Sequence, residues 1–187
     1  MIVGQTDIPG CYAVSPESHD DSRGSLTKTF VASALADAGV AVGPFREQFH
    51  TCSGRGVLRG MHVQAPPADG DKLVVCVFGE ALDVVVDLRV DSPGYRRVTS
   101  FELRARGDSL LVPAGVAHGF YVTSDECIMA YSTTYEYAAE SDGGVHWASI
   151  GFDWPDENPV VSTRDERLPR LADYGSPFVH RLDGTLS

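Results

Sequence analysis

A histidine and a lysine placed close together in this chain have the chemistry needed to remove a proton beside a carbonyl group. His62 follows Arg59-Gly-Met directly, and ten residues later Lys72 opens an apolar run over residues 73–78. Imidazole, with an unperturbed pKa of about 6.5, suits a general base at neutral pH. An ammonium group stabilises the negative charge that develops on a carbonyl oxygen. The pair therefore predicts proton abstraction next to a ketone.

Two further clusters supply a second histidine and candidate acids. The segment Pro113-Ala-Gly-Val-Ala-His118-Gly-Phe-Tyr121 contains the histidine, and Tyr131-Ser-Thr-Thr-Tyr-Glu-Tyr137 contains phenols. A phenol has an ordinary pKa of about 10, so it holds a proton at neutral pH that it can donate. Each cluster lies on or beside a strand-like run, so a β-barrel can bring them to one cavity.

The elements that must position these residues are mostly strands. Residues 1–30 are expected to be extended, with a turn at residues 20–24. The alanine-rich segment 31–39 predicts a helix that ends at a glycine. From Pro44 onward the pattern becomes typical of β-structure.

The middle of the chain predicts a run of short strands. Residues 73–78 are continuously apolar, as in a strand buried on both faces, whereas 82–88 alternates. The alternation places Asp83 and Asp87 together, either on an outward face or, for Asp83, lining a barrel. Further strands are expected at 98–103, 109–112, 119–123 and 127–134. Turn signals separate them at intervals of roughly ten residues, which predicts an antiparallel sandwich or barrel.

Length and the absence of a linker predict one domain over all 187 residues. We expect N-terminal strands and a helix over 1–45, a barrel core over 46–137, and a C-terminal segment over 138–187. That last segment is expected to form short helices and loops that pack on the barrel.

Charge and cysteine usage narrow the class of partner and the compartment. The net charge of −11 argues against nucleic acid, which requires clustered basic residues. Most basic residues are arginines, so a few of them can still hold a diphosphate. The four cysteines show no metal-binding or redox spacing, and no apolar run approaches the ~20 residues of a membrane span. We expect free thiols, a cytoplasmic location and no membrane partner.

Several segments, in chain order, carry a resemblance to a known family. The pattern from Gly107 through Pro113-Ala-Gly115 to His118 resembles the second cupin motif. Four longer stretches are similar to the dTDP-4-dehydrorhamnose 3,5-epimerase family: GVLRGMH at 56–62, GEALDVVVDLR at 79–89, VPAGVAHGF at 112–120 and AYSTTYEY at 130–137. Shorter matches are Asp21-Ser-Arg-Gly24, Gly144-Val-His-Trp147 and Ser162-Thr-Arg-Asp165. The resemblance spans nearly the whole chain.

The resemblance implies a fold, an assembly and a reaction. It implies an all-β, cupin-like double-stranded β-helix, that is, a jelly-roll barrel, in a homodimer whose N-terminal strands are exchanged. It implies epimerisation at C3, C5 or both of a nucleotide-diphospho-4-keto-6-deoxy sugar, with dTDP the default nucleotide. Proton removal and return proceed through an enolate, with no metal and no other cofactor.

The same resemblance implies roles for individual residues. His62 matches the base, Asp165 the carboxylate that fixes its tautomer, Lys72 the cation beside the C4 oxygen, and Tyr131 the acid on the far face. The implied substrate-binding residues are Arg23, Lys28, Glu47, Phe49, Arg59, His118 and Tyr137, with Arg23 contributed by the neighbouring subunit.

Some of these binding positions depart from the family pattern. Glu47, Phe49 and Thr51 stand where the family carries Gln, Asn and Ser, and Lys28 reverses a charge near the nucleotide. These departures leave the nucleotide (dTDP, CDP or GDP), the sugar and the inverted centre open. They fall on binding positions, so the reaction class is retained.

Three other interpretations stay open at this stage. A metal-dependent cupin would need ligands such as His62, Gln64 and His118, a set poor in donors and close to the cation of Lys72. A sugar-nucleotide-binding cupin without activity would bind substrate but exchange no protons. A ketoisomerase would move the carbonyl group of the same substrates. Individually, His118 is either a pocket residue or a structural one, and Tyr137 either lines the site or packs under the tail.

Overall fold

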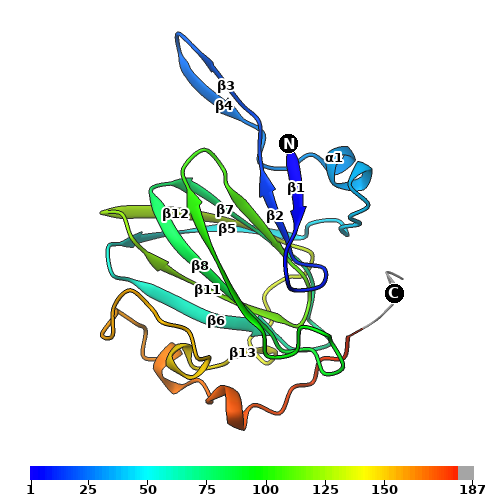
Figure 1. Cartoon of the computed structure of the whole chain (residues 1–187), viewed down its shortest axis with the longest axis vertical. Helices are drawn as coiled ribbons and strands as arrows, with labels where there is room; N and C mark the ends of the chain where they lie inside the picture. Colours follow the sequence, from blue (N-terminus) through cyan, green and yellow to red (C-terminus); the bar gives the residue numbers. More distant parts are fainter. Residues whose placement is uncertain (181–187) are drawn as a thin grey trace.

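The computed structural model describes residues 1–180, which form two facing β-sheets (Figure 1). The six-stranded sheet has the order β1 (Ile2–Gln5), β2 (Tyr12–Ser15), β10 (Ser109–Val112), β7 (Lys72–Phe78), β12 (Glu126–Thr133) and β5 (Glu47–Gly54). The five-stranded sheet has the order β13 (Asp142–Gly144), β6 (Leu58–Gln64), β11 (Val116–Val122), β8 (Glu80–Asp87) and β9 (Val98–Arg104). Neighbouring strands pair antiparallel throughout. The predicted antiparallel sandwich is confirmed.

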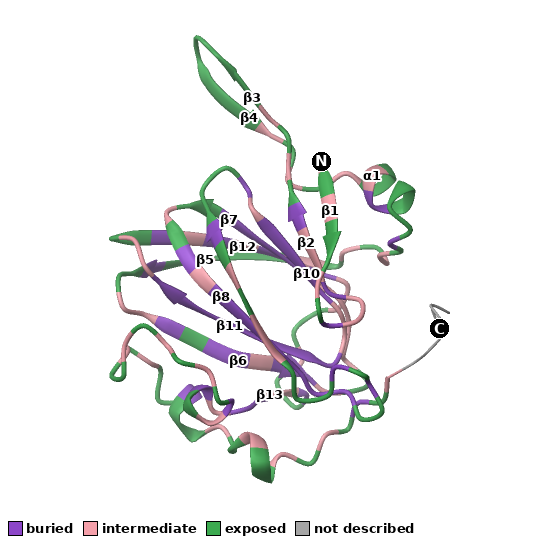
Figure 2. Cartoon of the chain, viewed as in Figure 1, coloured by how far each residue is buried: buried purple, intermediate pink, exposed green. Residues whose placement is uncertain are grey.

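An arm near the N-terminus projects away from these two sheets (Figure 1). It is a hairpin of β3 (Ser18–Asp21) and β4 (Gly24–Thr27), and its turn lies where the sequence predicts one. Most of its residues are exposed (Figure 2). The helix α1 (Ala32–Asp37) follows, shorter than the predicted 31–39.

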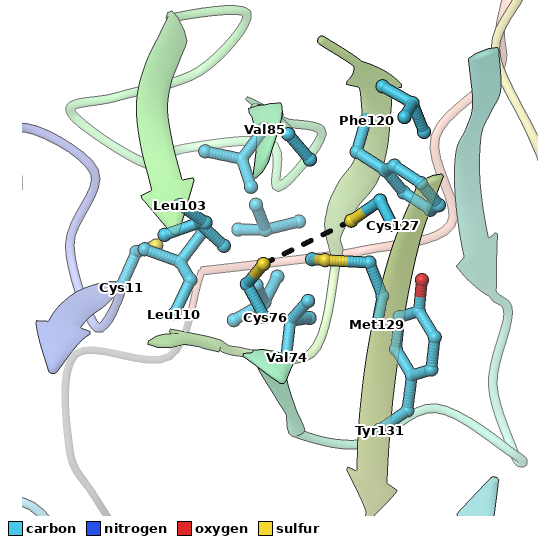
Figure 3. Close-up of a cluster of buried hydrophobic side chains, with 14 of the residues drawn as sticks. Cys11, Val74, Cys76, Val85, Leu103, Leu110, Phe120, Cys127, Met129 and Tyr131 are labelled. Atoms are coloured by element: carbon cyan, nitrogen blue, oxygen red, sulfur yellow. Dashed lines mark hydrogen bonds between the residues drawn. The ribbon is translucent and has the colours of Figure 1, made fainter. Parts of the chain in front are cut away.

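The main core lies between the two sheets. Strand β12 alternates between buried and partly exposed residues, so every second side chain points inward. Figure 3 shows these side chains meeting others from β7, β8, β10 and β11. In this core the Sγ atoms of Cys76 and Cys127 lie 4.0 Å apart as free thiols, and all four cysteines of the chain are free.

A second core forms where the C-terminal segment covers the outer face of the five-stranded sheet. Val84 and Val86 of β8 pack there against Val145, Ile150 and Phe178. The segment contains the short 3-10 helices η1 (Trp147–Ser149), η2 (Asp165–Arg167) and η3 (Leu171–Asp173). Phe152, Trp154, Leu171 and Tyr174 of this segment also pack against the second core, and residues 181–187 of the predicted C-terminal segment 138–187 lie outside the described part of the chain.

This covering corrects the interpretation of β8 as a strand with an outward face. Asp83 and Asp87 are both 0% exposed, because the other sheet covers one face of β8 and the C-terminal segment covers the opposite face. Asp87 forms an ion pair with Arg89, and Asp83 faces the space between the sheets, where it bonds to His118. Within residues 1–180 no helix has the length and apolarity to cross a membrane.

Candidate active site

A cavity of about 340 Å³ opens between the two sheets at the ends of β5, β6 and β7. Two predicted catalytic residues face this cavity from opposite sheets: Lys72 begins β7 of the six-stranded sheet, beside Thr133, and His62 lies on β6 of the five-stranded sheet, where it pairs with His118. The lining residues are Glu47, Phe49, His62, Val63, Gln64, Lys72, Thr133, Tyr135, Tyr137, Asp142 and Arg164.

A carboxylate from the C-terminal segment holds the imidazole of His62. Asp165 is buried, and its Oδ1 lies 2.7 Å from Nε2 of His62, while its Oδ2 accepts a hydrogen bond from the Gly60 amide at 3.2 Å. A carboxylate can only accept, so Nε2 carries the proton and Nδ1 keeps its lone pair. The pair therefore presents Nδ1 as the basic atom.

Glycine allows the strand that follows the barrel to approach this histidine. Gly144 of β13 pairs with His62 and has a φ of +153°, and a Cβ there would lie 1.8 Å from the Met61 carbonyl oxygen. A side chain at this position would push β13 away from β6. The chain thereby brings Asp142, at the start of β13, to the cavity wall.

Burial and charge act in opposite directions on the His62–Asp165 pair. Burial lowers the pKa of His62, and the Asp165 carboxylate offsets only part of this, so the pKa stays below its ordinary value. Burial would raise the pKa of Asp165, but the bonds from His62 and the Gly60 amide outweigh it and lower that pKa. At neutral pH the site therefore holds a neutral imidazole and an ionised carboxylate.

Arg164 is a cation in the cavity that the sequence reasoning missed. Its Nη2 lies 2.6 Å from Oδ2 of Asp142, and its Nη1 lies 3.2 Å from Nε2 of His62. Arg164 is half exposed, so part of the guanidinium is open to a ligand in the cavity. The sequence offered one clue to Arg164, its position directly before the predicted site residue Asp165. It does not show that the side chains of both residues reach the same cavity.

Lys72 is the second cation of the cavity. Burial lowers its pKa to about 8, against the opposing effect of the Asp83 and Asp142 carboxylates. The ammonium form therefore predominates at neutral pH but is close to losing its proton. Such an ammonium group can stabilise the negative charge that develops on a substrate oxygen beside it.

His118 and Asp83 form a second, more deeply buried pair. Nε2 of His118 lies 2.7 Å from Oδ2 of Asp83, and both side chains are almost completely buried. Oδ1 of Asp83 has no hydrogen-bond partner among the described residues. The pair lies behind the cavity wall, which favours a supporting position for His118 over direct exposure in the cavity.

Tyr131 lies behind Phe49 and close to the same cavity. The two rings stack with centroids 4.7 Å apart and planes at 16°, and they are direct partners across β12 and β5. Phe49 is among the residues that line the cavity, whereas Tyr131 is not. Burial raises the pKa of the Tyr131 phenol above its ordinary value, so the hydroxyl keeps its proton throughout the neutral range.

The remaining predicted binding residues lie in three places: in the cavity, beside it on β6, and in or next to the arm. Glu47 and Tyr137 line the cavity, where Oε2 of Glu47 accepts the Tyr137 amide at 2.7 Å. Nε of Arg59 donates to Ser53 Oγ at 3.0 Å, outside the lining set. Arg23 pairs with Asp21 in the arm, which projects away from the sheets in Figure 1, and Lys28 directly follows the arm. Neither residue lines the cavity of its own chain.

The side chains considered for a metal site have other partners. Nε2 of Gln64 donates to the Ala68 carbonyl at 2.9 Å, and its Oε1 accepts the Ala138 amide at 2.8 Å. Nε2 of His62 and of His118 each face a carboxylate at 2.7 Å. Within the described range, no group of three or more His, Cys, Asp or Glu residues is arranged to hold a metal ion.

Comparison with known proteins identifies the family. A family model described as dTDP-4-dehydrorhamnose 3,5-epimerase matches residues 5–173. The chain belongs to this epimerase family. It is an isomerase by class, and the predicted resemblance is confirmed. The curated dTDP-4-dehydrorhamnose 3,5-epimerase of Shigella flexneri is 37% identical over 176 residues, which cover 92% of this chain and 97% of the relative.

Solved structures of epimerases share the fold. The epimerase of Legionella pneumophila Philadelphia 1, in complex with dTDP-4-keto-L-rhamnose, superposes with a TM-score of 0.89 at 29% identity and covers 97% of this chain and 98% of that one. ChmJ, a 3'-monoepimerase from Streptomyces bikiniensis in complex with dTDP-quinovose, gives a TM-score of 0.83 at 32% identity and covers 90% and 87%. The cupin-like β-fold is confirmed for this epimerase family member.

Proposed function

We propose that this protein epimerises C3, C5 or both of a nucleotide-diphospho-4-keto-6-deoxy sugar, most simply a dTDP sugar. The observation that carries the proposal is the His62–Asp165 pair in one cavity with the ammonium group of Lys72. These groups are a base and an oxyanion stabiliser, the two requirements for enolisation. The names and ligands of the similar epimerases support the substrate class.

The proposed reaction uses the C4 ketone to acidify the neighbouring C–H bonds. Nδ1 of His62 removes the proton from C3 or C5, and the electron pair of that bond moves into the C4 carbonyl to give an enolate. The ammonium of Lys72 lies beside the C4 oxygen and stabilises its negative charge. Tyr131 then donates its phenolic proton to the opposite face of the carbon, which inverts the centre. Solvent afterwards takes the proton from the imidazolium and returns one to the phenolate.

The diphosphate and nucleotide are assigned to cations and aromatic residues around the cavity. Arg164 and Arg59 hold the diphosphate, since a guanidinium binds phosphate oxygens in a fork geometry. Tyr137, which is exposed and lines the cavity, packs against the sugar or the base. Glu47 and Phe49 complete the pocket, and His118 supports it from behind.

The position of the arm suggests that the complete site contains residues from a second copy of the chain. Arg23 and Lys28 are at the projecting hairpin, whose exposed residues gain partners when they reach the cavity of another subunit. We therefore propose a homodimer with exchange of the N-terminal arms. Sedimentation analysis should give twice the chain mass, and deletion of residues 18–27 should weaken dTDP binding and dissociate the dimer. A monomer that binds dTDP fully would contradict this assembly.

Deuterium incorporation tests the reaction itself. Incubation of the protein with dTDP-4-keto-6-deoxyglucose in heavy water should place deuterium at C3, C5 or both, and the labelled position identifies the inverted centre. CDP and GDP analogues run in parallel should identify the nucleotide. Binding without label at either carbon would favour a non-catalytic sugar-nucleotide-binding protein. A product whose carbonyl has moved to C3 would favour a ketoisomerase.

We place the single-domain enzyme in the cytoplasm, where its four free thiols stay reduced.

A further inference from the structure

The ring of Tyr131 lies in a slot whose walls are Phe49, His118 and Val74. Phe49 stacks on one face at a centroid distance of 4.7 Å, and His118 meets the ring edge-on at 6.2 Å. Val74, the β7 partner of Tyr131, is fully buried beside it. The His118 wall is fixed by its bond to Asp83 at 2.7 Å. Phe49 is the wall that lines the cavity.

Phe49 differs from the other walls in its exposure and place in the sheet. It is 44% exposed, whereas Tyr131 is 6% exposed. It lies on β5, the edge strand of the six-stranded sheet, so only one neighbouring strand restrains its backbone. The cavity touches Phe49 first and the phenol is behind it. Phe49 thus lies between the Tyr131 ring and the cavity.

We propose that Phe49 is a positioning residue for Tyr131: by stacking on the phenol ring it fixes the direction of the hydroxyl and so determines how often a removed proton is replaced from the opposite face. The inference rests on the proposed epimerisation. Each proton removed by His62 has two fates. His62 returns a proton to the same face, which gives exchange with retention, or Tyr131 delivers one to the other face, which gives inversion. By holding the phenol, Phe49 acts on the second fate.

The test is the ratio of inversion to exchange in heavy water, measured by NMR at C3 and C5. Phe49→Ala and Phe49→Leu remove the stacked ring and should lower this ratio about tenfold, the population change expected from losing an aromatic pair. The ratio is the readout because weaker substrate binding lowers exchange and inversion together, whereas a misdirected phenol lowers inversion relative to exchange. Phe49→Tyr keeps a stacked ring and should retain the wild-type ratio.

Other roles for Phe49 give different results. If Phe49 serves only to bind substrate, Phe49→Ala will raise KM or the Kd for dTDP and leave the ratio unchanged. If it serves only to hold the fold, exchange and inversion will fall in the same proportion. Either result, or an unchanged ratio in both Phe49→Ala and Phe49→Leu, overturns the proposal. The melting temperature of each variant shows that the protein compared is folded, and Phe49→Leu keeps an apolar side chain if Phe49→Ala fails to fold.

A second measurement needs no turnover and separates this inference from the proposed function. Tyrosinate absorbance is titrated with alkali in proteins with and without Tyr131→Phe, so that the difference reports the Tyr131 phenol alone. Removal of Phe49 should expose that phenol and lower its pKa toward the ordinary value. An unchanged titration would show that Phe49 does not cover Tyr131. Absence of any exchange in the wild type, with this shift present, would reject the epimerase function but not the stacking.

Discussion

Nε2 of His62 and Oδ1 of Asp165 lie 2.7 Å apart although the two residues are separated by 103 positions in the chain. The contact joins the barrel strand β6 to the short helix η2 of the C-terminal segment. Since the carboxylate occupies Nε2, the tail of the protein selects the nitrogen that is left to act as the base. In the proposed mechanism the C-terminal segment positions the base and also covers the sheet.

Asp165→Asn should slow proton exchange and shift its pH dependence. Loss of the carboxylate removes the interaction that raises the His62 pKa, so the acid limb of kcat/KM, already below about pH 6.5, should move to still lower pH. The exchange rate should fall by about a hundredfold or more, because the tautomer is no longer fixed. The pH profile of deuterium incorporation measures both effects.

Arg164→Met is the matched comparison for the shift of the acid limb in Asp165→Asn. The Arg164 cation lowers the pKa of His62, so its removal should move the acid limb to higher pH. It should also weaken dTDP binding, since a cation of the cavity is lost. Acid limbs that move in the same direction in both variants would contradict the electrostatic assignment of this cluster.

His62→Ala and Tyr131→Phe should separate the two halves of the reaction. Without the base no proton leaves the sugar, so His62→Ala should show neither exchange nor inversion. Without the phenol the base still works, so Tyr131→Phe should retain exchange at one or both carbons while inversion falls by about a hundredfold or more. NMR of the recovered sugar in heavy water distinguishes these outcomes. Wild-type inversion in either variant would reject the assigned role.

Lys72 should give the reaction an alkaline limb. Its pKa of about 8 means that the ammonium is present at neutral pH and is lost as the pH rises through that value, so kcat should fall above about pH 8. Lys72→Arg keeps the charge at higher pH and should remove this limb, whereas Lys72→Met should reduce exchange by about a hundredfold to a thousandfold. An alkaline limb that persists unchanged in Lys72→Met would assign it to another group.

The buried ion pair at the end of β8 should contribute to stability and not to chemistry. Asp87 accepts hydrogen bonds from Nε of Arg89 at 2.8 Å and from Ser92 Oγ at 2.6 Å. Asp87→Ala leaves the guanidinium buried without its partner and should lower the free energy of unfolding in urea by about 3–5 kcal/mol. Glu102→Gln, which breaks the exposed pair with Arg104, should cost less than about 1 kcal/mol.

The same pair predicts a pH dependence of stability. Burial would raise the pKa of Asp87, but the bonds from Arg89 and Ser92 outweigh it and hold the pKa below its ordinary value. A carboxyl group with a lowered pKa in the folded state stabilises the protein above its unfolded pKa of about 3.9, and this is lost as the pH falls through the lower, folded value. Urea unfolding followed from about pH 5 down to about pH 2 should show this loss in the wild type and a smaller one in Asp87→Ala.

The sequence by itself was sufficient to place several strands along the chain, and it singled out His62, Lys72 and Tyr131 as candidates. Alternation with a period of two shows which residues share a face of a strand, and turn residues show where strands end. The predicted strands at 73–78 and 109–112 therefore agree with β7 and β10. These signals depend only on residues that are close together in the sequence, so they can be recognised without knowledge of the fold.

Only the tertiary structure decided what covers each face and which distant residues meet. The alternation in β8 placed Asp83 correctly on a common face with Asp87 but could not show that both faces are buried, because the cover comes from the other sheet and the C-terminal segment. In the same way Arg164 enters the cavity, and Phe49 comes to lie over Tyr131, through packing and strand register between segments far apart in the sequence. Periodicity fixes the direction of a side chain relative to its own strand, whereas its partner depends on the whole fold.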